Sequence, residues 1–165
     1  MSIDSHRATM ESSLHECESH LRWIERDRAL LSGLFPLQSD ELSHAEDRSI
    51  ELVDQFIYRF TKLQDSMARR LLPSYYSLLE GRDEPVPFLD MLNRLEQLGL
   101  LTSTSDWQLF RALRNNLAHD YPESAEQTVL TLNQLYEEWP KLRRMFERIR
   151  ADYRRREAER PEDPR

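Results

Sequence analysis

The chain of 165 residues has little of several things: one cysteine, three glycines and no long apolar run. The single Cys17 excludes an intramolecular disulfide and is typical of proteins kept in a reducing compartment. No stretch approaches the roughly 18 to 20 apolar residues that a membrane helix needs. The N-terminus also lacks the apolar core of a signal peptide. We therefore expect a soluble, cytoplasmic protein that does not enter a membrane.

Spacings of three and four between apolar residues predict helices along most of the chain. Together with the scarcity of glycine and a charged fraction of 32%, they indicate an all-α fold. We expect a single antiparallel bundle of four to five helices over residues 10–156. Residues 1–9 are polar and are predicted to be flexible. Residues 157–165 are charged and rich in proline, so a disordered tail is predicted there.

Prolines and glycines set the expected boundaries of these helices. A helix that starts near residue 39 or 43 is expected to kink or end at Pro73. Residues 80–87 have the composition of an exposed loop. A short helix over residues 88–98 should be capped by Gly99. Pro140 falls inside the periodicity of the last helix, where we expect a kink or a restart.

Acidic and basic residues are unevenly distributed, although the net charge of the chain is −7. Residues 1–54 contain 12 acidic and 5 basic side chains, whereas residues 141–156 contain eight basic and two acidic ones. Solvated helix faces are the simpler interpretation of such segregation. The alternative is an electropositive strip beside an acidic surface that binds a partner.

Polar side chains that could take part in catalysis or ligand binding gather in one segment, residues 107–122. A helix is predicted to begin there after the capping residues 103–106 and to end at Pro122. At about 100° per residue, Phe110, Leu113 and Leu117 share one face, which should be buried. Arg114 projects only about 40° from Phe110, so it should lie at the edge of that apolar face.

The run Arg114-Asn115-Asn116-Leu117-Ala118-His119 matches the R-x4-H signature of HEPN domains. Extended to Tyr121, it resembles the R-x4-H-x-Y form of HepT toxins, which are paired with a minimal nucleotidyltransferase (MNT) antitoxin. The preceding run, residues 90–101, resembles the helix end before the motif helix in that family. The resemblance covers residues 47–150.

This resemblance implies a homodimeric endoribonuclease toxin of a type VII-like toxin–antitoxin pair, with two R-x4-H motifs facing one cleft. RNA would be cleaved without a metal or other cofactor. His119 would transfer protons and Arg114 would stabilise charge at phosphorus. Asn115 would orient the His119 ring or hold a phosphate, and the same helix offers Arg111 and Asn116 for RNA binding.

The same resemblance gives Tyr121 a role as the hydroxyl to which the MNT partner transfers AMP, which would block the cleft. Two observations favour a dimer. One histidine per chain does not easily serve as both acid and base, and two-fold symmetry supplies the second. In a continuous helix, Arg114 and His119 also project about 140° apart.

Two alternatives stay open. A helix that ends in Arg, Asn and His also fits simple polar capping, because these side chains interact with the C-terminal end of the helix dipole. The second alternative is a non-catalytic HEPN module that binds a nucleotidyltransferase, a nucleotide or RNA without cutting it.

Overall fold

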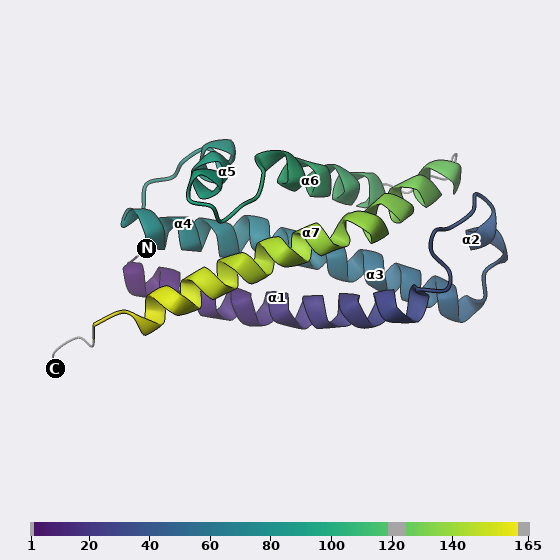
Figure 1. The fold of residues 1–165 in the computed structure, drawn as a ribbon, viewed down its shortest axis with the longest axis horizontal. Coiled ribbons are helices and arrows are strands. Elements are labelled where there is room, and N and C mark those ends of the chain that lie inside the picture. The colour runs from purple at the N-terminus through teal and green to yellow at the C-terminus, as the bar shows by residue number, and fades with distance from the viewer. Residues whose placement is uncertain (1, 119–124, 162–165) are drawn as a thin grey trace.

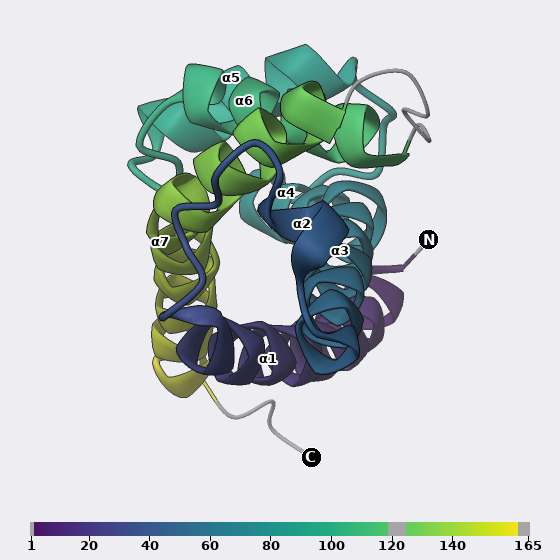
Figure 2. The same cartoon turned by 90° about the vertical axis from the view of Figure 1, so that its right-hand side faces the viewer.

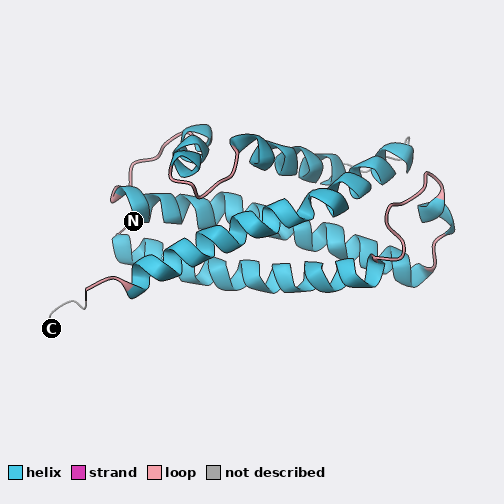
Figure 3. Cartoon of the chain, in the orientation of Figure 1, coloured by secondary structure: helices cyan, strands magenta, loops and turns pink. Residues whose placement is uncertain are grey.

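The computed structural model describes residues 2–118 and 125–161, and in these residues every regular element is a helix (Figure 3). The predicted all-α class is confirmed. The elements are α1 (Ile3–Leu31), α2 (Glu41–His44), α3 (Asp47–Ser66), the π-helical turn η1 (Met67–Leu71), α4 (Leu72–Glu80), α5 (Phe88–Gln97), α6 (Thr104–Ala118) and α7 (Ala125–Ala158).

The α3, η1 and α4 segments form one continuous rod that lies beside α1 (Figure 1). Viewed end-on, α1 lies on one side of the molecule and α5 and α6 lie on the opposite side (Figure 2). The α3–η1–α4 rod and α7 close the two flanks, and α7 crosses from α6 to α1. The described residues thus form five rods and the one-turn helix α2, which makes six helical segments where the sequence predicted four to five helices.

A single core fills the space between these rods, and its largest members are fully buried aromatic side chains. Phe60 of the long rod meets Phe110 of α6, with ring centroids 6.4 Å apart. Phe88 of α5 lies 6.0 Å from Trp107 of α6. These contacts fix α6 against both α3 and α5. The position of the candidate motif helix is therefore set by core packing.

Residues 3–9, within the segment predicted to be flexible, form the start of α1. The Ser2 hydroxyl accepts a hydrogen bond from the backbone N–H of Ser5 and caps α1. His6 is buried, and its Nε2 lies 2.6 Å from Asp83 Oδ1 in the loop after α4. A polar segment can therefore be helical when a cap and a distant side chain hold it. At the other end α7 reaches Ala158, and the last four residues of the predicted tail lie outside the described residues.

Pro73 and Pro140 each lie in a helical rod that continues past them. The main second helix, α3, begins at Asp47, later than predicted, and the rod continues past Pro73 to Glu80. The π-helical turn just before Pro73 widens the backbone: the Leu72 N–H donates to the Met67 carbonyl, five residues back. Pro140 lies inside an unbroken α7, so the predicted restart is absent.

The loop after α4 agrees with its prediction. Residues 81–85 and Pro87 are exposed, while Val86 is half-buried against the core. Gly81, which ends α4, has a φ of 62°, in the left-handed region that glycine adopts without a steric penalty. Gly99 ends the predicted short helix in the same way, with a φ of 74°.

The segregated charges of the two chain ends meet each other in the fold. Four ion pairs join α1 to α7 among the described residues. In three of them a glutamate of α1 meets an arginine of α7: Glu11 to Arg154 at 2.7 Å, Glu18 to Arg150 at 3.5 Å, and Glu25 to Arg143 at 3.4 Å. In the fourth, Arg7 of α1 meets Glu157 of α7 at 3.3 Å. The three glutamates of α1 are seven residues apart, so they follow one stripe of that helix. Much of the basic stretch is therefore neutralised within the chain, and it does not form the free electropositive strip that the sequence left open.

None of the described helices is long and apolar enough to cross a membrane.

Candidate functional site

The candidate motif helix forms as predicted up to Ala118, after which residues 119–124 lie outside the described residues. α6 begins at Thr104 and continues to Ala118. Phe110 and Leu113 are buried, which confirms their assignment to the core, while Leu117 is half-buried and packs against the same core. Trp107, one turn before Phe110, is fully buried on this face. Its position three residues before Phe110 was the available sequence signal for this additional core residue.

The predicted site residues fall into two groups. Arg111 and Asn115 of α6 are exposed, and Arg114 and Asn116 are half-buried. The two predicted functional groups that follow the helix, His119 and Tyr121, lie outside the described residues. Their meeting with Arg114 therefore stays a prediction.

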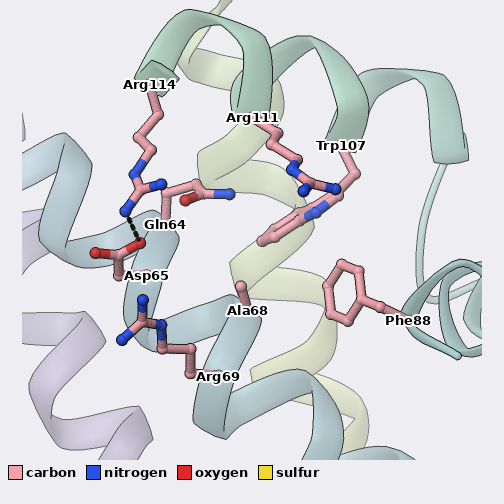
Figure 4. Close-up of a pocket in the computed structure, with 8 residues that line it drawn as sticks. All are labelled: Gln64, Asp65, Ala68, Arg69, Phe88, Trp107, Arg111 and Arg114. Carbon is pink, nitrogen blue, oxygen red and sulfur yellow. Dashed lines mark ion pairs between the residues drawn. The ribbon is translucent and has the colours of Figure 1, made fainter. Parts of the chain in front are cut away.

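Arg114 points from α6 to α3, where it forms an ion pair (Figure 4). Its Nη2 lies 2.7 Å from Asp65 Oδ1, and its Nη1 donates to Asn115 Oδ1 at 3.3 Å. Both partners of the ion pair are partly accessible, with 27% and 29% of their side-chain surfaces exposed. The predicted placement of Arg114 at the edge of the apolar face is confirmed, and Asn115 contacts the arginine of the motif.

A pocket of about 240 Å³ opens beside this ion pair. It lies between the long rod and α6, with one side chain of α5 at its end (Figure 4). Its lining residues are Gln64, Asp65, Ala68, Arg69, Phe88, Trp107, Arg111 and Arg114. The pocket therefore combines guanidinium groups with an aromatic wall.

The pocket carries a positive charge in a chain whose net charge is negative. Three guanidinium groups line it against one carboxylate, which leaves a surplus of two positive charges. Asp65 pairs with Arg114, and no ion pair to Arg69 or Arg111 is present among residues 2–118 and 125–161. A concave, partly desolvated surface strengthens the field of such charges. Anionic groups are the ligands that this arrangement favours.

The sequence did not point to Arg69 or Asp65. Both come from the long rod, in which apolar residues recur at the spacing of a core helix. Two weak signals were present: Gln64 places a polar group on the apolar face, and Pro73 indicates a helical irregularity close to Arg69. Neither signal says which other helix these side chains would face.

Among the described residues there is no group of three or more His, Cys, Asp or Glu side chains with the spacing of a metal site. Cys17 is fully buried, and burial raises the pKa of its thiol to about 12. Such a thiol is neither a ready ligand nor a nucleophile at neutral pH.

Comparisons with models of known families, with curated proteins and with solved structures find no match to this chain.

Proposed function

We propose that the protein is a metal-independent endoribonuclease of the HepT-like type, in which Arg114 and His119 carry out the reaction. The observation that carries the proposal is the position of Arg114, at the edge of a pocket with surplus positive charge and partly accessible to solvent. RNA is a polyanion, and guanidinium groups bind its phosphates with two parallel hydrogen bonds. The first residue of the motif thus stands where a phosphate would be bound.

The reaction follows from the two side chains. His119 would accept the proton of a ribose 2′-OH while that oxygen attacks phosphorus. The bond from phosphorus to the 5′ oxygen breaks, and this oxygen takes a proton from His119 of the partner subunit. The products are a 2′,3′-cyclic phosphate and a 5′-hydroxyl. Arg114 would stabilise the negative charge that develops on the phosphorus oxygens.

A homodimer belongs to this proposal because it supplies the second histidine. Arg111, which lines the pocket, and Asn116 would bind flanking RNA. An MNT-type nucleotidyltransferase would act as the antitoxin and transfer AMP to Tyr121. A phosphate-bearing group at this position would add negative charge next to the motif and oppose RNA binding.

One observation favours a second candidate function, a non-catalytic module that binds nucleotides or RNA. Asp65 Oδ1 already forms an ion pair with Arg114 Nη2 at 2.7 Å. An arginine held in this way has part of its charge neutralised, which suits binding or positioning better than stabilisation of a transition state. This reading predicts phosphate-dependent binding without product.

Cleavage of a defined RNA by purified protein tests the proposal, with and without EDTA. We expect cleavage of RNA to 2′,3′-cyclic phosphate ends, unaffected by EDTA and reduced about 10²- to 10⁴-fold by His119→Ala. Arg114→Ala should reduce it nearly as much. Arg22→Gln, an exposed substitution on α1, serves as the control and should cleave normally.

The mass in solution tests the dimer, and growth on expression tests the toxin. Tyr121→Phe should keep cleavage but escape transfer of AMP by a nucleotidyltransferase. Wild-type protein and His119→Ala that are equally inert on RNA and equally tolerated by cells would refute the nuclease and leave the binding module in its place.

A further inference from the structure

We infer that the pocket between η1 and α6 is a phosphate-binding subsite in which Arg69, a residue outside the motif, binds the phosphate together with Arg111 and Arg114. The ligand class is a phosphate mono- or diester. That RNA supplies it rests on the proposed function, whereas binding of a phosphate group rests on the pocket alone.

The unpaired charge of the pocket is the first argument. Arg143, Arg150 and Arg154 of α7 are each matched by a glutamate of α1. Within the described part of the chain, by contrast, neither Arg69 nor Arg111 has an ion-pair partner. Two like charges that face one small pocket repel each other unless an anion lies between them. A bound phosphate would supply that anion.

The arrangement of the guanidinium groups is the second argument. Arg111 and Arg114 extend from α6 on one side of the pocket, and Arg69 extends from η1 on the other (Figure 4). A tetrahedral phosphate presents oxygens in several directions and can be held from both sides at once. Guanidinium groups match phosphate oxygens bidentately, so the arrangement suits a phosphate.

Two buried donors give the third argument. The indole Nε1–H of Trp107 and the Nε–H of Arg114 are both buried and have no hydrogen-bond acceptor in the residues described. Both side chains line the pocket. A buried donor without an acceptor costs stability, and oxygens of a bound phosphate are suitable acceptors.

Asp65 has a distinct part in this subsite, since it is the pocket's single carboxylate. It occupies Arg114 when no ligand is bound, so an incoming phosphate must compete with it. Removing its charge without changing its shape should therefore strengthen phosphate binding. If Asp65 served only to position Arg114, the same change would weaken binding. The sign of the effect separates the two roles.

The test measures binding without cleavage. A fluorescein-labelled single-stranded RNA is titrated with full-length protein carrying His119→Ala, and fluorescence anisotropy gives the dissociation constant. Arg69→Gln and Arg111→Gln should each weaken binding about tenfold, the effect of losing one charged hydrogen bond. Asp65→Asn should strengthen binding. Arg22→Gln, the matched control that removes one exposed arginine of α1, should change it less than about twofold.

Competition identifies the source of the phosphate. AMP should displace the RNA, and adenosine at equal concentration should not. If labelled AMP binds in an Arg69-dependent way and RNA does not bind, the phosphate comes from a free nucleotide. Arg69→Gln and Arg111→Gln that bind like Arg22→Gln would overturn the subsite. Asp65→Asn that binds more weakly would overturn only the competing role of Asp65 and leave it as a positioning residue for Arg114. If binding depends on Arg69 but the protein with His119 intact does not cleave RNA, the nuclease proposal is refuted and the subsite stands.

Discussion

Replacing Asp27 by asparagine should stabilise the protein at neutral pH. Asp27 lies on α1 and is fully buried, and neither of its carboxylate oxygens accepts a hydrogen bond from a described residue. The neighbouring Arg26 Nη1 is 3.8 Å away, on a side chain that is 46% exposed. Burial raises the pKa of Asp27, and the nearby arginines offset this only in part. The folded state therefore carries a charge that it solvates poorly.

The magnitude follows from these contacts. A buried polar group without a hydrogen bond costs about 1–3 kcal/mol, and a charged one costs more. An ion pair with an exposed arginine returns less than about 1 kcal/mol. Asparagine keeps the shape and the polar atoms but removes the charge, so we expect a gain of about 1–2 kcal/mol at pH 7. For a chain of this size, each kcal/mol raises the melting temperature by about 2–4 °C.

The pH dependence gives a second readout. The folded-state pKa lies above the ordinary value of 3.8, so the cost of the charge is full at neutral pH. It falls as the pH drops through the folded-state pKa, and below 3.8 both the folded and the unfolded chain carry the proton. The stability difference between Asp27→Asn and the wild type should therefore shrink between pH 7 and pH 4. Urea unfolding followed by circular dichroism measures it.

Glu25→Gln is the control, because it removes the same charge from the same helix. Glu25 Oε1 accepts a hydrogen bond from Trp139 Nε1 at 2.6 Å and lies 3.4 Å from Arg143. The free energy of unfolding of this variant should fall by about 1 kcal/mol, because a charge-assisted hydrogen bond is weakened. An Asp27→Asn protein that is less stable than the wild type at pH 7, or a difference that is the same at both pH values, would refute the reasoning.

Three further results are expected. Phe110→Ala should lower the free energy of unfolding by about 3–5 kcal/mol in urea titrations, because it empties a fully buried site; a loss below about 1 kcal/mol would contradict the packing of α6. Cys17, whose pKa burial raises to about 12, should react with 5,5′-dithiobis(2-nitrobenzoate) at pH 8 only after unfolding. Rapid reaction of the native protein would contradict that burial. A double-mutant cycle on Glu11 and Arg154 should give a coupling below about 1 kcal/mol that decreases in 1 M salt, since both side chains are about half-exposed.

The sequence determined those features that depend on neighbours along the chain. Apolar spacing identified the α class and most of the helices. The capping residues before α6 and the periodicity of Phe110 and Leu113 located the motif helix and its buried face. The projection of Arg114 beside Phe110 placed that arginine at the edge of the core. Each of these inferences uses separations of a few residues, where helix geometry alone fixes the relative positions of side chains.

Tertiary structure decided which distant groups meet. Asp65 and Arg114 are 49 positions apart in the sequence, yet they form the ion pair beside the pocket. Arg69 reaches that pocket because core packing sets the long rod against α6. The sequence allowed two interpretations of the acidic and basic segments. In the fold these segments form ion pairs with each other because α1 and α7 lie side by side. Helical periodicity says which side of a helix is buried, whereas the partner of that side depends on how all the helices fill one core, and a single helix's pattern does not encode it.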